Sequence, residues 1–201
     1  MNNCLRRSFY HGETSTVARK LLGKKLVRVM PTPQVPQQLV GIITETEAYG
    51  GSEDPASHAY NGRKPRSSIM FGVKGVCYVY FVYGMYHCTN VVAYSGKNDA
   101  GAVLIRSIFP IEGIKSMMKN RKINKFRDLA NGPGKLSMAL LIDKSLNGVD
   151  LTDSNSFLNI QDGIESSRVQ CTSRIGVSLG KAVKWRFVLL DDVTTSLVLP
   201  K

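Results

Sequence analysis

Four of the eight tyrosines in this 201-residue chain lie within nine residues, in the run Tyr78-Val-Tyr80-Phe-Val-Tyr83-Gly-Met-Tyr86. Aromatic and β-branched residues favour strands, and Gly84 permits a sharp reversal of the chain. Side chains alternate between the two faces of a strand, so Tyr78 and Tyr80 should share a face that Tyr83 does not. The run therefore predicts a hairpin with one ring-bearing face turned inward and with Tyr83 presented at or near the tip.

The rest of the chain favours strands and a few short helices. Pro110 and Pro133 each suit the first turn of a helix, where the N–H that proline lacks would be unpaired anyway. Strand and helix do not alternate as in βαβ units, which favours one α+β domain over residues 1–201, with a mostly antiparallel sheet and flanking helices. The predicted strands are 24–30, 39–48, 76–83, 86–93, 102–107, 157–160 and 185–190; the predicted helices are 14–22, 110–119 and 133–142; the predicted irregular segments are 31–36 and 50–68.

The chain carries a formal net charge of +12, while its 43% of hydrophobic residues is ordinary for a globular protein. The surplus of Lys and Arg must face solvent, and such surfaces meet polyanions such as DNA, RNA or anionic lipid. No apolar run approaches the roughly 18 residues that span a membrane, and the N-terminus has no signal-peptide core. We therefore expect nucleic acid rather than a membrane as the partner, with general basicity and no partner as the alternative.

The cysteine and histidine pattern argues against a metal centre. No two of the four cysteines form a CxxC pair, and the three histidines do not lie at zinc-ligand spacing from them. Cys77 and Cys88 lie in apolar, strand-like sequence, where a free thiol acts as a small hydrophobic group. We expect a reducing intracellular compartment and neither a metal nor a cofactor.

Two glutamates mark a possible acid–base site. Glu45 and Glu47 are two apart on a predicted strand and should share a face, which is either solvated or functional. A functional carboxylate there could activate water or stabilise positive charge, with Tyr49 lining the same cavity. Arg106 ends an apolar strand, where a lone Arg usually forms a structural ion pair. If Arg106 pairs with Glu47, it would keep that carboxylate ionised and help to hold a water.

A second polar segment, Glu53-Asp54-Pro-Ala-Ser-His58, allows three interpretations. The carboxylates and the imidazole could bind a divalent metal, although acidic loop residues are usually just solvated. His58 could instead form a stacking or hydrogen-bonding wall. The residues alone do not decide among these.

Two basic segments suit contacts with phosphates. Arg63, Lys64 and Arg66 cluster in a loop, followed by Met70 and Phe71, which are either core residues or a wedge against a minor groove. Residues 115–127 carry six Lys or Arg and no acid, whereas a solvated helix normally mixes both signs. This single-sign segment is a stronger indication of a polyanion partner than the net charge alone.

In their order along the chain, these segments resemble the alkyladenine (3-methyladenine) DNA glycosylases of the mammalian type. The resemblance extends from about Phe9 to the Trp185-Arg-Phe187 region. It is carried by several ordered motifs: Glu45-Thr-Glu47-Ala-Tyr49, His58, Arg66-Ser-Ser-Ile-Met70-Phe71, Tyr78-Val-Tyr80-Phe-Val-Tyr83-Gly-Met-Tyr86-His-Cys-Thr-Asn90, Leu104-Ile-Arg106, Gly132-Pro-Gly-Lys135-Leu and Arg174-Ile-Gly-Val.

The resemblance implies an enzyme of base-excision repair that acts on double-stranded DNA containing damaged purines. It would flip an alkylated or deaminated purine nucleotide out of the duplex and hydrolyse the N-glycosidic bond, leaving an abasic site without cutting the strand. It also implies a curved sheet with a protruding β-hairpin and no cofactor. We expect a monomer, located in the cytoplasm if the source is bacterial and in the nucleus if it is eukaryotic.

The same resemblance assigns roles to individual residues. Glu47 would be the general base, while Arg106 and the backbone carbonyl of Ile175 would help to hold the attacking water. The walls that stack on the flipped base would be Tyr49, His58 and Tyr80, and Asn90 would disfavour the guanine amino group. The residues that contact the DNA would be Tyr83, which fills the gap in the duplex, Met70 and Tyr86 in the minor groove, and the basic residues Arg63 and Arg66.

Two other classes of function remain open from the residues themselves. One is a non-catalytic DNA- or RNA-binding module whose tyrosines stack on single-stranded bases. The other is a metal-dependent nuclease that uses Glu47, Glu53, Asp54 and His58.

Overall fold

The computed structural model describes residues 3–31, 37–190 and 193, and every strand pairing among them is antiparallel. Its strands are β1 (Lys25–Met30), β2 (Gln37–Tyr49), β3 (Cys77–Val82), β4 (Tyr86–Val92), β5 (Ala102–Glu112), β6 (Leu158–Gln161), β7 (Val169–Thr172) and β8 (Arg186–Leu189). Its helices are α1 (Thr14–Lys20), α2 (Ile114–Arg121) and α3 (Pro133–Ala139), with short 3-10 turns η1 (Arg7–Tyr10), η2 (Ser68–Phe71), η3 (Phe126–Asp128) and η4 (Lys144–Leu146).

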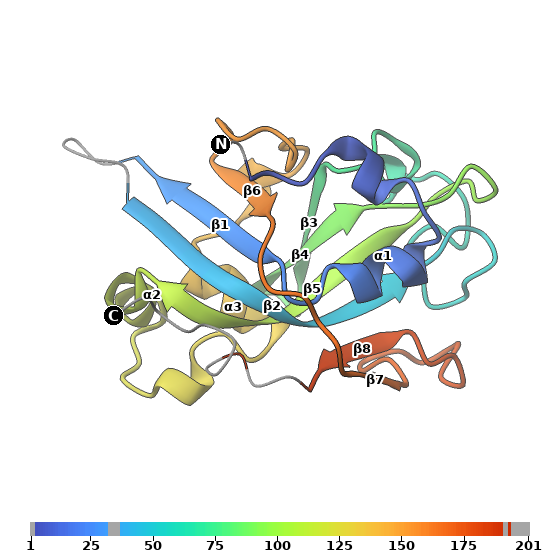
Figure 1. Cartoon of the computed structure of the whole chain (residues 1–201). Coiled ribbons are helices and arrows are strands. Elements are labelled where there is room, and N and C mark those ends of the chain that lie inside the picture. The colour runs from blue at the N-terminus through green and yellow to red at the C-terminus, as the bar shows by residue number, and fades with distance from the viewer. Residues whose placement is uncertain (1–2, 32–36, 191–192, 194–201) are drawn as a thin grey trace.

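These strands form one curled sheet in the order β3-β4-β5-β2-β1-β6, and β8 joins β2 while β7 joins β8 (Figure 1). Helix α1 packs on β2 and β5, and α3 packs on β4, β5 and α2. The predicted α+β class and the mainly antiparallel sheet are therefore confirmed.

Strand β2 organises the sheet because it is long enough to pair with three other strands. One edge pairs with β5 along nearly the whole of β2, whereas the other edge pairs first with β1 and then with β8. The register against β5 shifts around Glu45, which bends the strand locally. The segment of β2 from Glu45 to Glu47 thus lies between β5 and β8, with a neighbour on both edges.

The β3–β4 hairpin separates two hydrophobic clusters, as the alternation of its side chains predicts. Val79 packs into the large core that also holds α1, α2 and α3. Tyr78 belongs to a second, smaller cluster with Met70 and Ala59, and Tyr80 packs against it. The opposite faces of one strand therefore serve the main core and a separate aromatic cavity.

The predicted helix beginning at Pro110 is wrong. Pro110 is buried within β5, opposite Gly41, at one of the register shifts between β5 and β2. A proline can occupy a strand where the ladder is interrupted, because no hydrogen bond is lost there. Gly113, with φ of 72°, ends the strand, and α2 begins at the next residue.

Other differences from the prediction are smaller. Strand β7 was not predicted, because none of its four residues is buried and they lack an apolar alternation. The remaining elements differ from their predicted ranges at the ends only, and segment 50–68 contains turns up to η2. Of the predicted loop at 31–36, residues 32–36 lie outside the described part of the chain.

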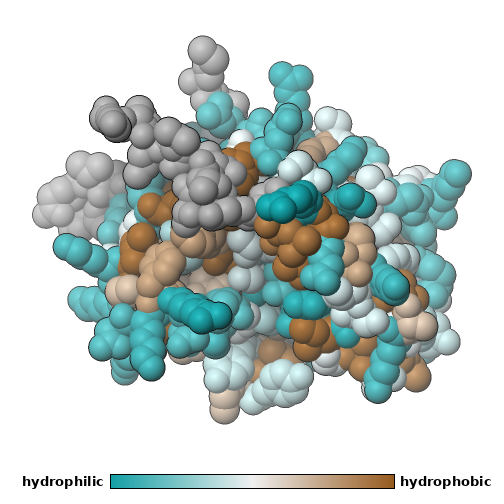
Figure 2. Space-filling view, turned by 60° about the horizontal axis from the view of Figure 1, so that its bottom comes forward, coloured by the Kyte–Doolittle hydropathy of each residue, from teal (hydrophilic) through white to brown (hydrophobic). Residues whose placement is uncertain are grey.

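The face of the molecule shown in Figure 2 has the mixed surface that is usual for globular proteins. In Figure 2, apolar side chains reach the surface in separate patches among hydrophilic ones. None of the helices in the described residues is long and apolar enough to cross a membrane.

Candidate active site

A pocket of about 480 Å³ opens between the β3–β4 hairpin and the segment that follows β7. Its volume falls within the range of about 300–1,000 Å³ that is usual for small-molecule sites. The wall residues come from β2, the segment between β2 and β3, β3, β4, β5, the start of α3 and the segment after β7; they include Tyr49, His58, Arg66, Met70, Tyr78, Tyr80, Tyr83, Tyr86, Cys88, Asn90, Arg106, Gly134, Lys135 and Ile175. Distant parts of the sequence therefore bring most of the predicted site residues to one cavity.

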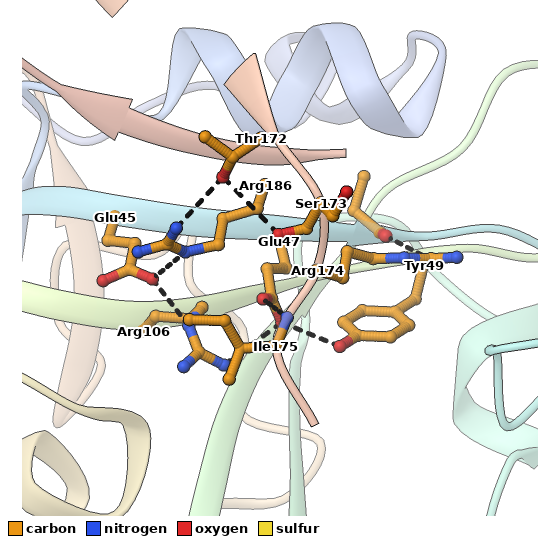
Figure 3. A network of polar contacts seen from close by, with 10 residues as sticks. Glu45, Glu47, Tyr49, Arg106, Thr172, Ser173, Arg174, Ile175 and Arg186 are labelled. Atoms are coloured by element: carbon orange, nitrogen blue, oxygen red, sulfur yellow. Dashed lines mark hydrogen bonds and ion pairs between the residues drawn. The ribbon is translucent and has the colours of Figure 1, made fainter. Parts of the chain in front are cut away.

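The Glu47 side chain is completely buried at this site, and three groups donate hydrogen bonds to its carboxylate. Its Oε2 accepts the Tyr49 hydroxyl at 2.7 Å and the Arg106 Nη1 at 3.2 Å. Its Oε1 accepts the backbone N–H of Ile175 at 2.7 Å (Figure 3). Three donors compensate for the loss of water around the carboxylate, so the site can hold Glu47 as an anion.

Arg106 binds both glutamates of the predicted pair. Its Nε donates to Glu45 Oε1 at 2.7 Å, in addition to the contact with Glu47. Burial opposes the charged guanidinium, but the negative charges of Glu47 and Glu45 outweigh it and raise the pKa of Arg106. Both the shared face of the two glutamates and the conditional pairing of Arg106 with Glu47 are confirmed.

Tyr49 supports Glu47 and also forms part of the pocket wall. Burial, the charge of Glu47 and the hydrogen bond to it together raise the pKa of the Tyr49 hydroxyl, which therefore remains a donor. The Arg174 guanidinium lies over the Tyr49 ring, 4.9 Å from its centroid. Any base that stacks on Tyr49 must use the face that Arg174 leaves free.

Arg174 and Asp54 form a buried ion pair to which sequence reasoning assigned no role. Arg174 Nη1 and Nη2 bind the two Asp54 oxygens at 2.6 and 2.8 Å, and Nη1 also donates to the Ala48 carbonyl. Burial raises the pKa of Asp54, but the hydrogen bonds from Arg174, Gly50 and Ala56 outweigh it and lower the pKa below its usual value. The pair fixes the backbone just before Ile175.

This pairing also bears on the metal-binding interpretation of the segment 53–58. Asp54 is occupied by Arg174, and Glu53 is an exposed residue that accepts a hydrogen bond from the Gly51 N–H. Across the described part of the chain, no group of three His, Cys, Asp or Glu residues could hold a metal ion. The residues considered for a nuclease therefore do not form a ligand set there.

The backbone of Ile175 contacts Glu47 directly through its N–H. The water-holding role that the resemblance implies for its carbonyl stays a prediction. The Ile175 side chain is half exposed at the mouth of the pocket. This segment therefore positions the carboxylate directly.

The rings of His58, Tyr78 and Tyr80 form one wall of the pocket. The His58 and Tyr80 rings are 4.7 Å apart at 78°, so a flat base cannot stack face-on against both. Tyr78 is buried and also bonds His58 Nδ1 through its hydroxyl at 2.9 Å. Burial and the positive charge of Arg66 lower the pKa of His58 to about 4, so its imidazole is neutral at neutral pH.

Asn90 lies on the pocket lining and is itself held firmly. Its Nδ2 donates to the Tyr78 carbonyl at 2.9 Å, and the residue is buried. Cys88, two residues earlier on the same face of β4, also lines the pocket. The Asn90 side chain cannot move aside without losing that bond.

The hairpin tip presents Tyr83 to solvent as predicted. Tyr83 and Gly84 both have positive φ, of 54° and 67°, and the Met85 N–H donates to the Val82 carbonyl. Positive φ at both central positions is the requirement of the type I′ hairpin turn. Tyr83 is 79% exposed, and Tyr86, which pairs with Val82 directly beside the turn, lines the pocket.

The other predicted DNA contacts occupy different environments. Met70 is only 1% exposed and packs inside the second cluster, so its position favours the core interpretation over a minor-groove contact. Arg66 lies over the Tyr80 ring at 5.0 Å, and Arg63 lies over the Phe71 ring at 5.7 Å. Both arginines are exposed and rest on aromatic faces, which leaves their outer edges open to solvent.

The basic segment 115–127 covers α2 and the turn η3. Its cations Lys115, Lys119, Lys122, Lys125 and Arg127 are exposed. The segment adjoins α3 through Asn120, which donates to the Ala139 carbonyl. A single-sign charged surface thus lies beside the helix whose first residues line the pocket.

Comparison with known proteins identifies the family of this chain. The family model described as methylpurine-DNA glycosylase (MPG) matches residues 8–193. A protein of Ehrlichia chaffeensis named "Putative 3-methyladenine DNA glycosylase" is 44% identical over 187 residues, which cover 93% of each chain. Proteins of the same name from Prosthecochloris aestuarii and Desulfitobacterium hafniense are 41% and 42% identical, covering 96% and 94% of this chain and 91% and 96% of their own. The chain therefore belongs to the methylpurine-DNA glycosylase family, and it is a DNA glycosylase, a hydrolase of N-glycosyl bonds.

Proposed function

We propose that this glycosylase flips an alkylated or deaminated purine nucleotide from duplex DNA into the aromatic pocket. There it would hydrolyse the N-glycosidic bond with a water activated by Glu47. Flipping is required because the bond to be cleaved is inaccessible within the base stack. The observation that carries the proposal is a fully buried carboxylate, held by three donors, beside a ring-lined pocket of suitable volume.

The chemistry needs an anion at the position of Glu47. Departure of the purine leaves positive charge on the sugar, which a carboxylate stabilises while it accepts the proton of the attacking water. Oε2 already accepts two hydrogen bonds, whereas Oε1 accepts one from the Ile175 N–H. We assign Oε1 as the oxygen with capacity for the water, since a carboxylate oxygen has two lone pairs.

The pocket walls suit a purine that carries a positive charge through alkylation. Such a base is already a good leaving group, and electron-rich rings stack favourably on cations. His58 supports this preference because its pKa of about 4 leaves its imidazole neutral at neutral pH. A protonated His58 in the same place would repel a cationic base.

The hairpin would supply the interaction that keeps the nucleotide extruded. Tyr83 presents its ring outward at the tip, where it could occupy the space that the flipped base leaves in the duplex. The exposed Arg63 and Arg66 on the adjoining loop would contact phosphates and set the orientation of the duplex.

The test is the Glu47→Gln variant, assayed by chromatography of bases released from methylated and from inosine-containing duplexes. We expect release to fall by about 10²–10⁴-fold, the usual contribution of general-base catalysis, while binding to the lesion duplex persists. Glu53→Gln is the matched control, because Glu53 is an exposed glutamate on the neighbouring loop. Undiminished release by Glu47→Gln would overturn the assignment of Glu47 as the general base. Loss of activity in EDTA would favour metal-dependent chemistry instead.

A further inference from the structure

Glu45 lies between two arginines and does not contact the pocket. Its Oε1 accepts the Nε of Arg106 at 2.7 Å and the Nε of Arg186 at 2.6 Å (Figure 3). The three side chains are only 12–22% exposed. Charges so placed interact more strongly than on an open surface, because little water screens them.

The position of Arg186 follows from the sheet. Arg186 on β8 is the direct cross-strand partner of Glu47 on β2, so the two side chains share a face. Its guanidinium nevertheless bonds Glu45, and its Nη1 donates to Thr172 Oγ1 at 3.0 Å. Thr172 ends β7, three residues before the Ile175 N–H that holds Glu47. Arg186 therefore joins the second carboxylate to the segment that positions the first.

Four charged side chains thus form a hydrogen-bonded chain in which the charge alternates in sign, in the order Arg186, Glu45, Arg106 and Glu47. We call this chain the relay. Its four charges sum to zero. Without the Glu45 charge, two guanidiniums would remain near one carboxylate, which would hold Glu47 as a tightly paired and weakly basic anion. Without the Arg186 charge, two carboxylates would share one guanidinium, which would favour protonation of Glu47.

We propose that Glu45 and Arg186 are positioning residues that act through Arg106 to set the proton affinity of Glu47. The inference rests on the proposed role of Glu47 as the general base. The other titratable groups that face this carboxylate are Tyr49 on β2, which donates to it, and Cys88 on β4; the backbone N–H of Ile175 also donates to it. Arg174 lies beyond the Tyr49 ring with its charge matched by Asp54. Only Glu45 and Arg186 therefore lie in the relay without binding Glu47 themselves.

The relay predicts opposite effects for two substitutions that each remove one charge. Glu45→Gln removes a negative charge, so the acidic limb of the rate–pH profile should move to lower pH by about one pH unit, with a lower plateau. Arg186→Gln removes a positive charge but keeps a donor for Thr172, so the limb should move to higher pH by a similar amount. The double variant restores the balance of charge, and its limb should return close to that of the parent.

The rate is measured as single-turnover release of 7-methylguanine from a duplex, because this cationic base departs without needing a proton. In parallel, proteins labelled with ¹³C at the glutamate carboxyl are titrated by NMR without DNA, and the Glu47 resonance is assigned from the Glu47→Gln spectrum. The NMR midpoint should shift in the same two directions, so the relay is tested even if no base is released. Shifts in the same direction for both single variants, or no shift together with a lower rate, would show a merely structural role and overturn the proposal.

Discussion

The site at Glu47 and the tip of the β3–β4 hairpin are held in opposite ways. Glu47 is 0% exposed, lies between two neighbouring strands and accepts three hydrogen bonds. Tyr83 is 79% exposed on a turn that is closed by one backbone hydrogen bond. The carboxylate is thus fixed by paired charges within a sheet, whereas the tyrosine depends on the backbone conformation of its turn alone.

The difference indicates a division of labour. A group that transfers a proton must be held within a fraction of an ångström, and strands with supporting hydrogen bonds provide that precision. A group that enters a deformable duplex needs access more than rigidity. Changes near Glu47 should therefore alter stability and catalysis together, while changes at the tip should alter DNA handling alone.

The largest effect on stability should follow from breaking the ion pair beneath the pocket. Arg174→Met leaves the Asp54 carboxylate buried and unpaired, which should lower the free energy of unfolding by about 3–5 kcal/mol in urea at neutral pH. Base release should also fall, because Arg174 fixes the backbone that carries the Ile175 N–H.

Two variants sharpen this result. Adding Asp54→Asn to Arg174→Met should recover part of the loss, since the unpaired charge is removed. Lys24→Met breaks a surface pair whose Asp162 partner is 67% exposed and should cost only about 0–1 kcal/mol. A loss for Arg174→Met no larger than that for Lys24→Met would contradict the structural importance of the buried pair.

Tyr83→Asn should separate the two regions in the other direction. Asparagine tolerates the positive φ of Tyr83, so the free energy of unfolding should stay within about 0.5 kcal/mol of the parent value. Retention of a flipped ethenoadenine, followed by stopped-flow fluorescence, should weaken by about ten- to hundredfold, equivalent to about 1–3 kcal/mol of ring stacking. An unchanged flipping equilibrium would remove Tyr83 from this role.

The features that the sequence predicted are those determined by neighbouring residues. The alternation along the tyrosine run placed Tyr78 and Tyr80 on one face, and Gly84 located the turn, because both depend on local backbone geometry. The shared face of Glu45 and Glu47 follows from the same period-two rule. Local rules were sufficient wherever a single strand decided the outcome.

The features that were missed depend on contacts between distant segments. Pro110 stays in a strand because the pairing of β5 with β2 shifts register beside it, which the local sequence cannot reveal. Arg174 and Asp54 are 120 residues apart, so neither suggests the other. Arg186, charged within an otherwise apolar short strand, was the one available indication of a buried partner.

The turn itself provides a test of smaller size. Gly84→Ala should lower the free energy of unfolding by about 1 kcal/mol, because alanine resists the left-handed conformation at φ of 67°. No atom lies within 4 Å of the added methyl group, so the cost is conformational and not steric. Gly96→Ala is the matched control: its methyl group also meets no atom within 4 Å, and its φ is not in the left-handed region. Equal losses for the two variants would show that the turn does not constrain the tip.

The smallest effect on stability should come from His58, at the rim between the two regions. Its pKa is about 4 in the folded protein, against an ordinary value of about 6.5 in an unfolded chain. Between these pH values the unfolded chain binds a proton that the folded protein does not, so stability should decline as the pH falls from about 6.5 to about 4 and should not depend on His58 above that range. The decline should be slight, because the His58 ring is partly open to solvent.

NMR titration of the His58 ring should give a midpoint near 4, and Arg66→Gln should raise that midpoint only partly, since burial is the larger cause of the lowered pKa and the charge of Arg66 the smaller. A midpoint near 6.5 would mean that His58 becomes cationic at the pocket wall near neutral pH, and the preference of this wall for a positively charged purine would then need another source.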